Sequence, residues 1–174
     1  MKNRARTLLA LLTLTFSAPA AQAAEPSPSD TVGETTRAAV EAKHERWKQA
    51  LADTKPDATV AKKLVAAGKG AEVVVYLGTW CGDSRREVSR LWKALELGGG
   101  KPAFSIKYVA LDRDMSAPGV TVPSELKYVP TFYVTKNGKE LGRIVESAPM
   151  GIETALLGLL EGTSKGVITG RETL

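Results

Sequence analysis

The sequence predicts an α/β domain built on a mixed β-sheet with helices on both faces, preceded by an N-terminal helical extension. From Pro56 onward, segments with apolar residues at helical spacing alternate with short apolar runs, which is typical of this class. The run "VVVYL" at 73–77 is continuous and β-branched, as in a strand buried on both faces. The stretch "KNGK" at 136–139 predicts a tight hairpin turn, which adds antiparallel pairing to the alternating pattern.

The N-terminus has the three parts of a secretory signal peptide. Three basic residues in the first six positions precede an apolar run at 8–16 and small residues that end in Ala21-Gln22-Ala23. The apolar run is too short to span a membrane comfortably. We therefore predict that residues 1–23 are removed on export, that the mature chain has no membrane span, and that it is periplasmic.

Composition limits the classes of function. The net charge of +5 includes Lys2, Arg4 and Arg6, so the mature chain carries 5 − 3 = +2. This charge is too small to indicate nucleic-acid binding. With one cysteine the chain cannot form an internal disulfide, although export places it where disulfides persist. A function for this protein has to account for that unpaired cysteine.

Residues 24–55 are predicted to form a spacer and an N-terminal helix. The polar stretch "EPSPSD" at 25–30 is followed by a capping-box pattern, Thr31 with Glu34. Four residues then recur on one helical face: Val40, His44, Trp47 and Leu51. A catalytic or metal-binding role for His44, the only histidine, would need a partner that its own helix does not supply. We therefore expect a structural, partly buried histidine.

Residues 56–164 are assigned to one domain and 165–174 to a C-terminal tail. Helices are predicted at 57–67, from the turn "GTWCGDS" to the glycines at 98–100, and after Ile152. Further strands are predicted at 104–111, 131–134 and 140–145.

The segment from about Pro56 to Gly162 resembles a thioredoxin-like domain. The resemblance rests on "VVVYLGTWCGDSRREV", on "VPTFYV" at 129–134, and on the "KNGK" hairpin before a closing amphipathic helix. It implies a three-layer sandwich in which Cys81 opens a helix. It also implies a cis peptide bond between Val129 and Pro130, with Thr131 completing a substrate-binding edge.

The residues around Cys81 suit thiol chemistry. A thiolate is the nucleophile in thiol–disulfide exchange, and a helix N-terminus favours an anion. Gly82 places no side chain over the sulfur, and the Ser84 hydroxyl, one turn along, could donate to it. Asp83 opposes a second negative charge, which neighbouring arginines offset. Together with Trp80, these residues form the predicted catalytic set.

Two departures from the two-cysteine relatives change the expected chemistry. In those relatives a second cysteine, at the position of Ser84, resolves the mixed disulfide. Many thioredoxins also carry a buried acid six residues before the reactive cysteine, where this chain has Val75. A mixed disulfide with a partner or a small thiol is therefore the expected intermediate.

Two functions remain open at this point. The first is an exported monothiol thiol–disulfide oxidoreductase acting on exported proteins that carry thiols or disulfides. It needs no bound cofactor, although glutathione or another small thiol could serve as co-substrate. The second is a redox-inactive module that binds an extended peptide between Trp80 and Pro130.

Other sites are weaker candidates. Monothiol glutaredoxins share a Cys-Gly-x-Ser tetrad and bind iron–sulfur clusters, but cluster sites need several thiolates and this chain has one. Export and Asp83, which replaces that family's aromatic residue, also argue against this assignment. Asp112 and Asp114 resemble a carboxylate metal loop, yet after a strand they more often form a solvated turn.

Overall fold

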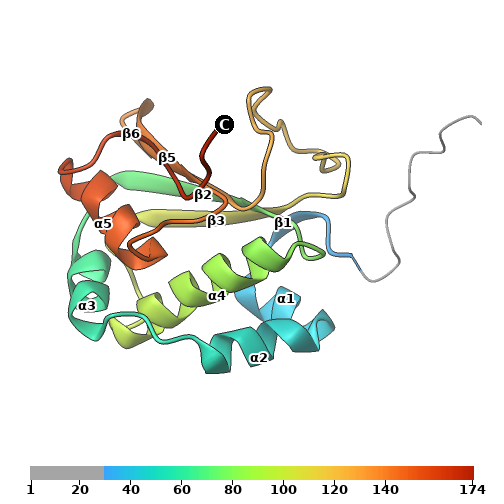
Figure 1. Ribbon diagram of the computed structural model, residues 1–174, viewed down its shortest axis with the longest axis horizontal. Helices are drawn as coiled ribbons and strands as arrows, with labels where there is room; N and C mark the ends of the chain where they lie inside the picture. The colour runs from blue at the N-terminus through green and yellow to red at the C-terminus, as the bar shows by residue number, and fades with distance from the viewer. Residues whose placement is uncertain (1–29) are drawn as a thin grey trace, which may run out of the picture.

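The computed structural model describes residues 30–174, which form one mixed six-stranded sheet and five helices (Figure 1). The predicted α/β class is thereby confirmed. The predicted signal peptide and nearly all of the spacer lie outside the described residues. No helix within residues 30–174 has the length and apolar character needed to cross a membrane.

The sheet has the order β1-β3-β2-β4-β5-β6. The strands are β1 (Gly33–Thr35), β2 (Ala71–Leu77), β3 (Ser105–Ala110), β4 (Thr131–Lys136), β5 (Lys139–Val145) and β6 (Gly166–Thr169). β2 pairs with β3, and β5 with β6, in parallel, while the other pairs are antiparallel. The hairpin between β4 and β5 turns at Asn137 and Gly138, whose φ angles of 52° and 73° suit the predicted tight turn.

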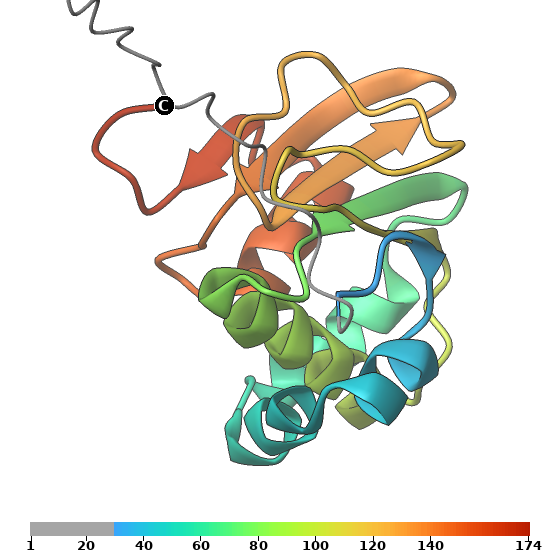
Figure 2. The same ribbon diagram turned by 90° about the vertical axis from the view of Figure 1, so that its right-hand side faces the viewer.

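The five helices of the described residues pack on one face of the sheet, not on both as predicted (Figures 1 and 2). They are α1 (Arg37–Lys43), α2 (Glu45–Asp53), α3 (Ala58–Ala66), α4 (Gly82–Leu97) and α5 (Ile152–Glu161). α3, α4 and α5 contact one another beneath the sheet, and α2 packs on α4. The helices therefore lie on one side of the sheet only.

The opposite face of the sheet is covered by the irregular segment 111–130. Its buried residues Leu111, Ala117 and Leu126 pack with Tyr76 and Tyr133, which point from the strands to this side. Proline and glycine at 118, 119 and 123 explain why the segment forms no helix, because they interrupt backbone hydrogen bonding and favour turns. The predicted second helical layer is thus replaced by a loop.

The N-terminal extension also differs from the single helix predicted from Thr31. Gly33 has a φ of +100°, and residues 33–35 pair with β3 as an edge strand. Thr36 caps α1 instead, with its hydroxyl accepting a hydrogen bond from the Ala39 N–H at 3.2 Å. His44 has extended backbone angles and separates α1 from α2. Edge pairing and a break at His44 therefore override the helical pattern.

The hydrophobic core beneath the sheet holds the start of α4 against the end of β2. Val73, Val75 and Leu77 alternate toward the helices, where they join the same buried cluster as Val88 and Leu91 of α4. Each fully buried aliphatic side chain contributes about 1.5–3 kcal/mol to this packing. β2 and α4 are thus held together on either side of the turn that carries Cys81.

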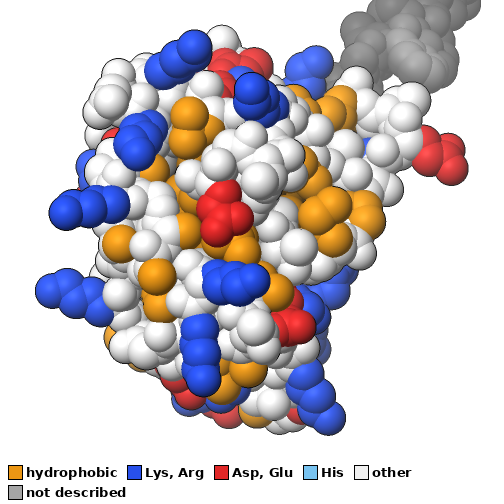
Figure 3. Space-filling model, turned by 90° about the vertical axis from the view of Figure 1, so that its left-hand side faces the viewer, with side chains coloured by type: hydrophobic (Ala, Val, Ile, Leu, Met, Phe, Trp, Pro, Cys, Tyr) orange, Lys and Arg blue, Asp and Glu red, His pale blue; other side chains and the backbone are white. Residues whose placement is uncertain are grey.

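Basic side chains are spread over the surface on the side that carries α3, α5 and the β5–β6 edge. Figure 3 shows Lys and Arg around this face with small apolar patches between them. Val167 of β6 is the exposed large apolar residue of this edge, with 49% of its surface accessible. This face lacks the continuous basic stripe expected of a nucleic-acid site.

Candidate thiol site at the start of helix α4

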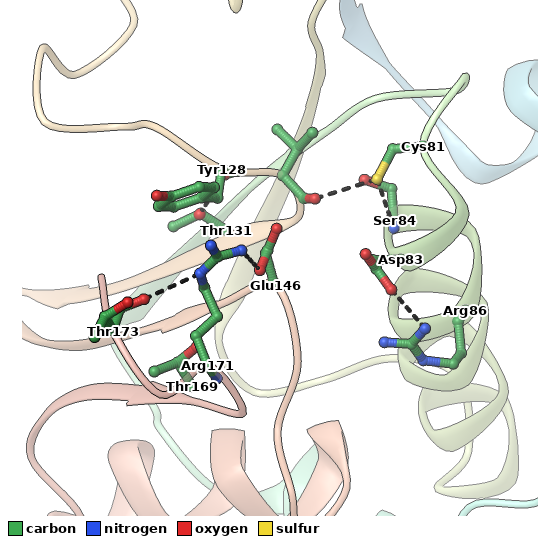
Figure 4. Close-up of polar contacts among 11 residues, drawn as sticks. Cys81, Asp83, Ser84, Arg86, Tyr128, Thr131, Glu146, Thr169, Arg171 and Thr173 are labelled. Carbon is green, nitrogen blue, oxygen red and sulfur yellow. Dashed lines mark hydrogen bonds and ion pairs between the residues drawn. The ribbon is translucent and has the colours of Figure 1, made fainter.

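Cys81 lies at the N-cap of α4, with extended backbone angles of φ −87° and ψ 129°. The side chain is partly exposed, and its Sγ accepts a hydrogen bond from the Ser84 N–H at 3.5 Å (Figure 4). The sulfur thus occupies the position where a capping side chain normally satisfies a free helix N–H. The same N–H would stabilise a thiolate at this position.

The segment expected to bind substrate lies opposite the sulfur. The Cys81 thiol donates to the Val129 carbonyl oxygen at 3.3 Å, a contact drawn as a dashed line in Figure 4. The Val129–Pro130 peptide bond is cis, as the resemblance implied. β2 and β4 are neighbours, which brings the residues before Thr131 alongside the turn that follows β2. The Thr131 hydroxyl donates to the Tyr128 carbonyl at 2.7 Å and closes this loop on itself.

Ser84 is fully buried, and its hydroxyl is part of the turn. The Ser84 Oγ accepts a hydrogen bond from the Gly78 N–H at 3.0 Å. The hydrogen bond to the sulfur comes from the Ser84 backbone N–H and not from the hydroxyl, which was the predicted donor. Ser84 therefore ties the first turn of α4 to the end of β2.

Trp80 folds back over the turn. Its indole Nε1 donates to the Leu111 carbonyl at 3.0 Å, and the Arg113 guanidinium lies 5.0 Å from the ring centroid. A Cβ atom at Gly78 would stand 2.7 Å from the Trp80 ring, so this position requires glycine. Trp80 is thereby held against the loop that covers the other face of the sheet.

The charged residues after Cys81 pair with one another. Asp83 Oδ1 lies 2.6 Å from Arg86 Nη1, and Arg86 Nε lies 2.9 Å from the buried Glu87. Burial raises the pKa of Glu87, although Arg86 acts in the opposite direction. The Asp83 carboxylate is thus balanced by a cation. A Cβ at Gly82 would meet only the Arg85 guanidinium, at 3.9 Å, so space remains open beside the sulfur.

Two features of the site had no counterpart in the sequence predictions. From the N-terminal side, the Trp47 indole N–H donates to the Thr79 carbonyl at 3.2 Å, and the Thr31 N–H donates to the Thr79 hydroxyl at 3.1 Å. These contacts join positions 32 and 48 residues apart, which no local pattern reveals. The helical spacing of Trp47 predicted its burial but not its partner.

The second feature is the C-terminal segment, which reaches the loop before the cis proline (Figure 4). Arg171 lies 4.1 Å from the centroid of the Tyr128 ring and 2.5 Å from the Glu146 carboxylate. The Glu146 N–H in turn donates to the Pro130 carbonyl at 2.7 Å. The residues assigned to a tail therefore include a strand, β6, and a contact with the candidate substrate loop.

The remaining candidate residues lie apart from the thiol. His44 Nε2 lies 3.1 Å from the Thr31 hydroxyl, and burial lowers the pKa of this histidine. Asp112 accepts hydrogen bonds from Asp114 and Ser116, so the predicted solvated turn is confirmed. Within residues 30–174 no three His, Cys, Asp or Glu side chains cluster in a way that could hold a metal ion.

No protein-family model matches the sequence. The chain is similar to Thioredoxin-like protein R548 of Acanthamoeba polyphaga mimivirus, with 27% identity over 89 residues that cover 51% of this chain and 62% of that protein. The match therefore supports a thioredoxin-like resemblance over about half of this chain.

Solved structures give weaker likenesses. A protein of unknown function from Pseudomonas aeruginosa, PA1234, has a TM-score of 0.49 and 16% identity, covering 74% of this chain and 88% of that one. Oxidised mitochondrial thioredoxin 3 from Saccharomyces cerevisiae has a TM-score of 0.32 and 21% identity, covering 64% and 97%. Both TM-scores are below 0.5, so neither likeness carries weight. The thioredoxin-like character of the fold rests on features of the chain itself, namely the helix that begins after Cys81, the cis proline, the β4–β5 hairpin and the closing helix α5.

Proposed function

We propose that this protein is an exported monothiol thiol–disulfide oxidoreductase that acts through a mixed disulfide on Cys81. One observation supports the proposal above the others. The only cysteine of the chain is partly exposed at a helix N-cap, its sulfur accepts a hydrogen bond from the Ser84 N–H, and its thiol lies 3.3 Å from the carbonyl oxygen of Val129, the residue before the cis proline. This arrangement offers a nucleophile, a group that stabilises its anion, and an adjacent backbone edge for a substrate.

The proposed reaction exchanges one disulfide for another. The Cys81 thiolate attacks one sulfur of a substrate disulfide, the substrate S–S bond breaks, and the second substrate sulfur leaves as a thiolate that takes up a proton. A thiolate from glutathione, another small thiol or a protein then attacks the mixed disulfide and releases Cys81. Each step conserves one S–S bond, so electrons pass from the incoming thiol to the substrate.

The absence of a second cysteine makes an external thiol necessary. Ser84 occupies the position of a resolving sulfur, and its hydroxyl cannot form a disulfide. Val75 stands where many thioredoxins place a buried acid, and it is fully enclosed among apolar side chains. The proposed enzyme therefore depends on its co-substrate both to complete turnover and to accept or supply protons.

The backbone edge around Val129 and Pro130 favours exported polypeptides as partners. In this proposal, the backbone around Val129 pairs with an extended client segment while its cysteine reacts with Cys81. Trp80, held between Leu111 and Arg113, forms the other wall of the site. Export and periplasmic location rest on the signal-like N-terminus.

The test is single-turnover reaction with oxidised glutathione. We expect the mature protein to form a one-to-one mixed disulfide that reduced glutathione or a peptide thiol removes, as followed by mass spectrometry. The Cys81→Ser variant is the control and should acquire no adduct. A sulfur that forms adducts only after denaturation would reject the enzyme and favour the redox-inactive peptide-binding module.

A further inference from the structure

The turn between β2 and α4 is held by a segment that lies far from it in the sequence. Thr79 is almost completely buried and receives two hydrogen bonds from the N-terminal extension. Its carbonyl oxygen accepts from Trp47 Nε1 at 3.2 Å, and its hydroxyl accepts from the Thr31 N–H at 3.1 Å. Both contacts are buried, where hydrogen bonds are stronger and an unpaired group is costly.

Trp47 links the N-terminal extension both to helix α4 and to the turn before Cys81. Its side chain is 1% exposed and its ring centroid lies 5.4 Å from that of Trp92 on α4. The same indole therefore packs on the helix that begins at Cys81 and donates to the turn that precedes it. The Thr79 carbonyl belongs to the peptide that leads into Trp80 and Cys81. A rotation of that peptide would move the backbone of Cys81.

We propose that Trp47 is a positioning residue for Cys81. Through the Thr79 carbonyl it keeps the turn in the conformation that brings the sulfur to the Ser84 N–H and to the Val129 carbonyl. The Thr31 contact fixes the same residue from its side chain. This inference rests on the proposed function, because it assigns the N-terminal extension a role in presenting the reactive thiol. Reactivity depends strongly on such placement, since small displacements of a reacting group cost rate.

The chain provides a matched control in its other buried tryptophan. Trp92 is 2% exposed and contacts Trp47, but its Nε1 has no well-formed hydrogen bond among residues 30–174. Trp92→Phe therefore removes similar aromatic volume from the same cluster without releasing the turn. Trp47→Phe removes the volume and also leaves the Thr79 carbonyl without its donor.

The experiment compares Trp47→Phe and Trp92→Phe in the mature protein. Urea unfolding first confirms that both variants are cooperatively folded. The rate of Cys81 alkylation is then measured across pH in the folded state. We expect Trp47→Phe to lower the rate at neutral pH by roughly three- to tenfold, the effect of losing one buried hydrogen bond that favours a single conformation. Trp92→Phe is expected to stay within about twofold of the parent protein, because no hydrogen bond to the turn is lost.

Equal effects of the two variants, or no effect of Trp47→Phe, would overturn the proposal. If Trp47→Phe does not fold, Thr79→Val removes the acceptor for the Thr31 N–H, and Thr79→Ser, which restores the hydroxyl, should recover the rate. Failure of Thr79→Ser to recover it would count against the part of the proposal in which the N-terminal extension holds the turn through the Thr79 side chain.

Amide hydrogen exchange separates this proposal from the proposed enzyme activity. The Cys81 N–H donates to the Gly78 carbonyl at 3.0 Å and reports on the closed turn. We expect faster exchange at this amide in Trp47→Phe than in Trp92→Phe, whatever the reactivity of the sulfur. An unreactive Cys81 in the parent protein would reject the enzyme, whereas unchanged exchange in Trp47→Phe would reject the positioning role.

Discussion

At the scale of single residues, Ser84 determines both the structure of the site and its chemistry. It is fully buried, and its hydroxyl accepts the Gly78 N–H at 3.0 Å while its N–H donates to the Cys81 sulfur. A serine in place of a resolving cysteine thus has a structural use: it closes the turn that presents the sulfur.

Ser84→Ala should therefore destabilise the fold. The substitution leaves the buried Gly78 N–H without its acceptor, which costs about 1–3 kcal/mol. Ser89→Ala is the matched control, because Ser89 is equally buried in α4 but its Oγ has no partner among residues 30–174. Urea denaturation should show a lower midpoint for Ser84→Ala alone. Equal midpoints for the two variants would show that the Ser84–Gly78 bond contributes little.

Ser84→Cys should convert the monothiol into a dithiol. The new sulfur lies three residues along α4 from Cys81, the spacing at which the second cysteine of two-cysteine relatives acts. We expect the mixed disulfide with glutathione to be released without added thiol, leaving a chain that is two hydrogens lighter by mass spectrometry. A glutathione adduct that persists in this variant would show that a sulfur at position 84 cannot resolve the mixed disulfide on Cys81.

At the scale of elements, an ion pair between the partly exposed Arg90 and the buried Glu153 joins α4 to α5. Arg90 donates to both carboxylate oxygens of Glu153, at 2.6 and 2.7 Å, and Glu153 is 1% exposed and also accepts from the Asp57 N–H. Burial alone would raise the pKa of Glu153, but the hydrogen bonds from Arg90 and the backbone lower it below the usual 4.5. The pair holds the helix that carries Cys81 against the closing helix.

This pair predicts a specific dependence of stability on pH. A carboxyl group whose pKa is lower in the folded state stabilises the fold above its unfolded pKa, near 4.5, and loses that contribution as the pH falls through the folded value. Glu153→Gln should therefore lower the free energy of unfolding at pH 7, by about 1.5–3 kcal/mol for the loss of hydrogen bonds to a charged group. The difference from the parent should shrink in acid below pH 4.5. A difference independent of pH would exclude this ionic contribution.

The C-terminal strand carries a second testable contact. Arg171 packs on Tyr128 at 4.1 Å and pairs with Glu146, beside the loop that holds the cis proline. Arg171→Ala should slow mixed-disulfide formation with a peptide disulfide but not with oxidised glutathione, because only the peptide needs the ordered loop. Arg143→Ala, which removes the similar contact on Tyr133, is the control. Equal slowing of both reagents by Arg171→Ala would contradict a role in peptide binding.

Periodicity in the sequence predicted some elements and not others, for physical reasons. α4 and β2 bury continuous or regularly spaced apolar residues, so local pattern and tertiary packing agree. The face formed by Val40, Trp47 and Leu51 also persists through the extension, but it gives no sign of the break at His44. The four residues of β6 are too few to show alternation.

The candidate site, too, could be predicted from the sequence only in part. The sequence placed Cys81 at a helix start and indicated the loop at Val129 and Pro130, because both follow from short motifs. It could not predict that the Ser84 hydroxyl would accept from Gly78. The contacts of Thr79 and Tyr128 depend on chain segments that meet only in the folded molecule.

At the scale of the whole molecule, the two ends of the described chain support the two halves of the site. The N-terminal extension holds the turn before Cys81 through Thr79, and the C-terminal segment contacts the opposite loop through Tyr128. The helices lie on one face of the sheet, while the loop 111–130 on the other face receives the Trp80 indole. The thiol thus lies where these layers meet.

The most direct test of the proposed chemistry is the rate of Cys81 alkylation at pH 7 in the folded protein, compared with the same chain in denaturant. No other thiol competes, because the chain has one cysteine. A thiolate stabilised by the free N–H groups at the helix N-cap predicts faster alkylation of the folded protein than of the unfolded chain. A folded-state rate equal to or below the rate in denaturant, or reaction only after unfolding, would contradict the assignment of Cys81 as a nucleophile.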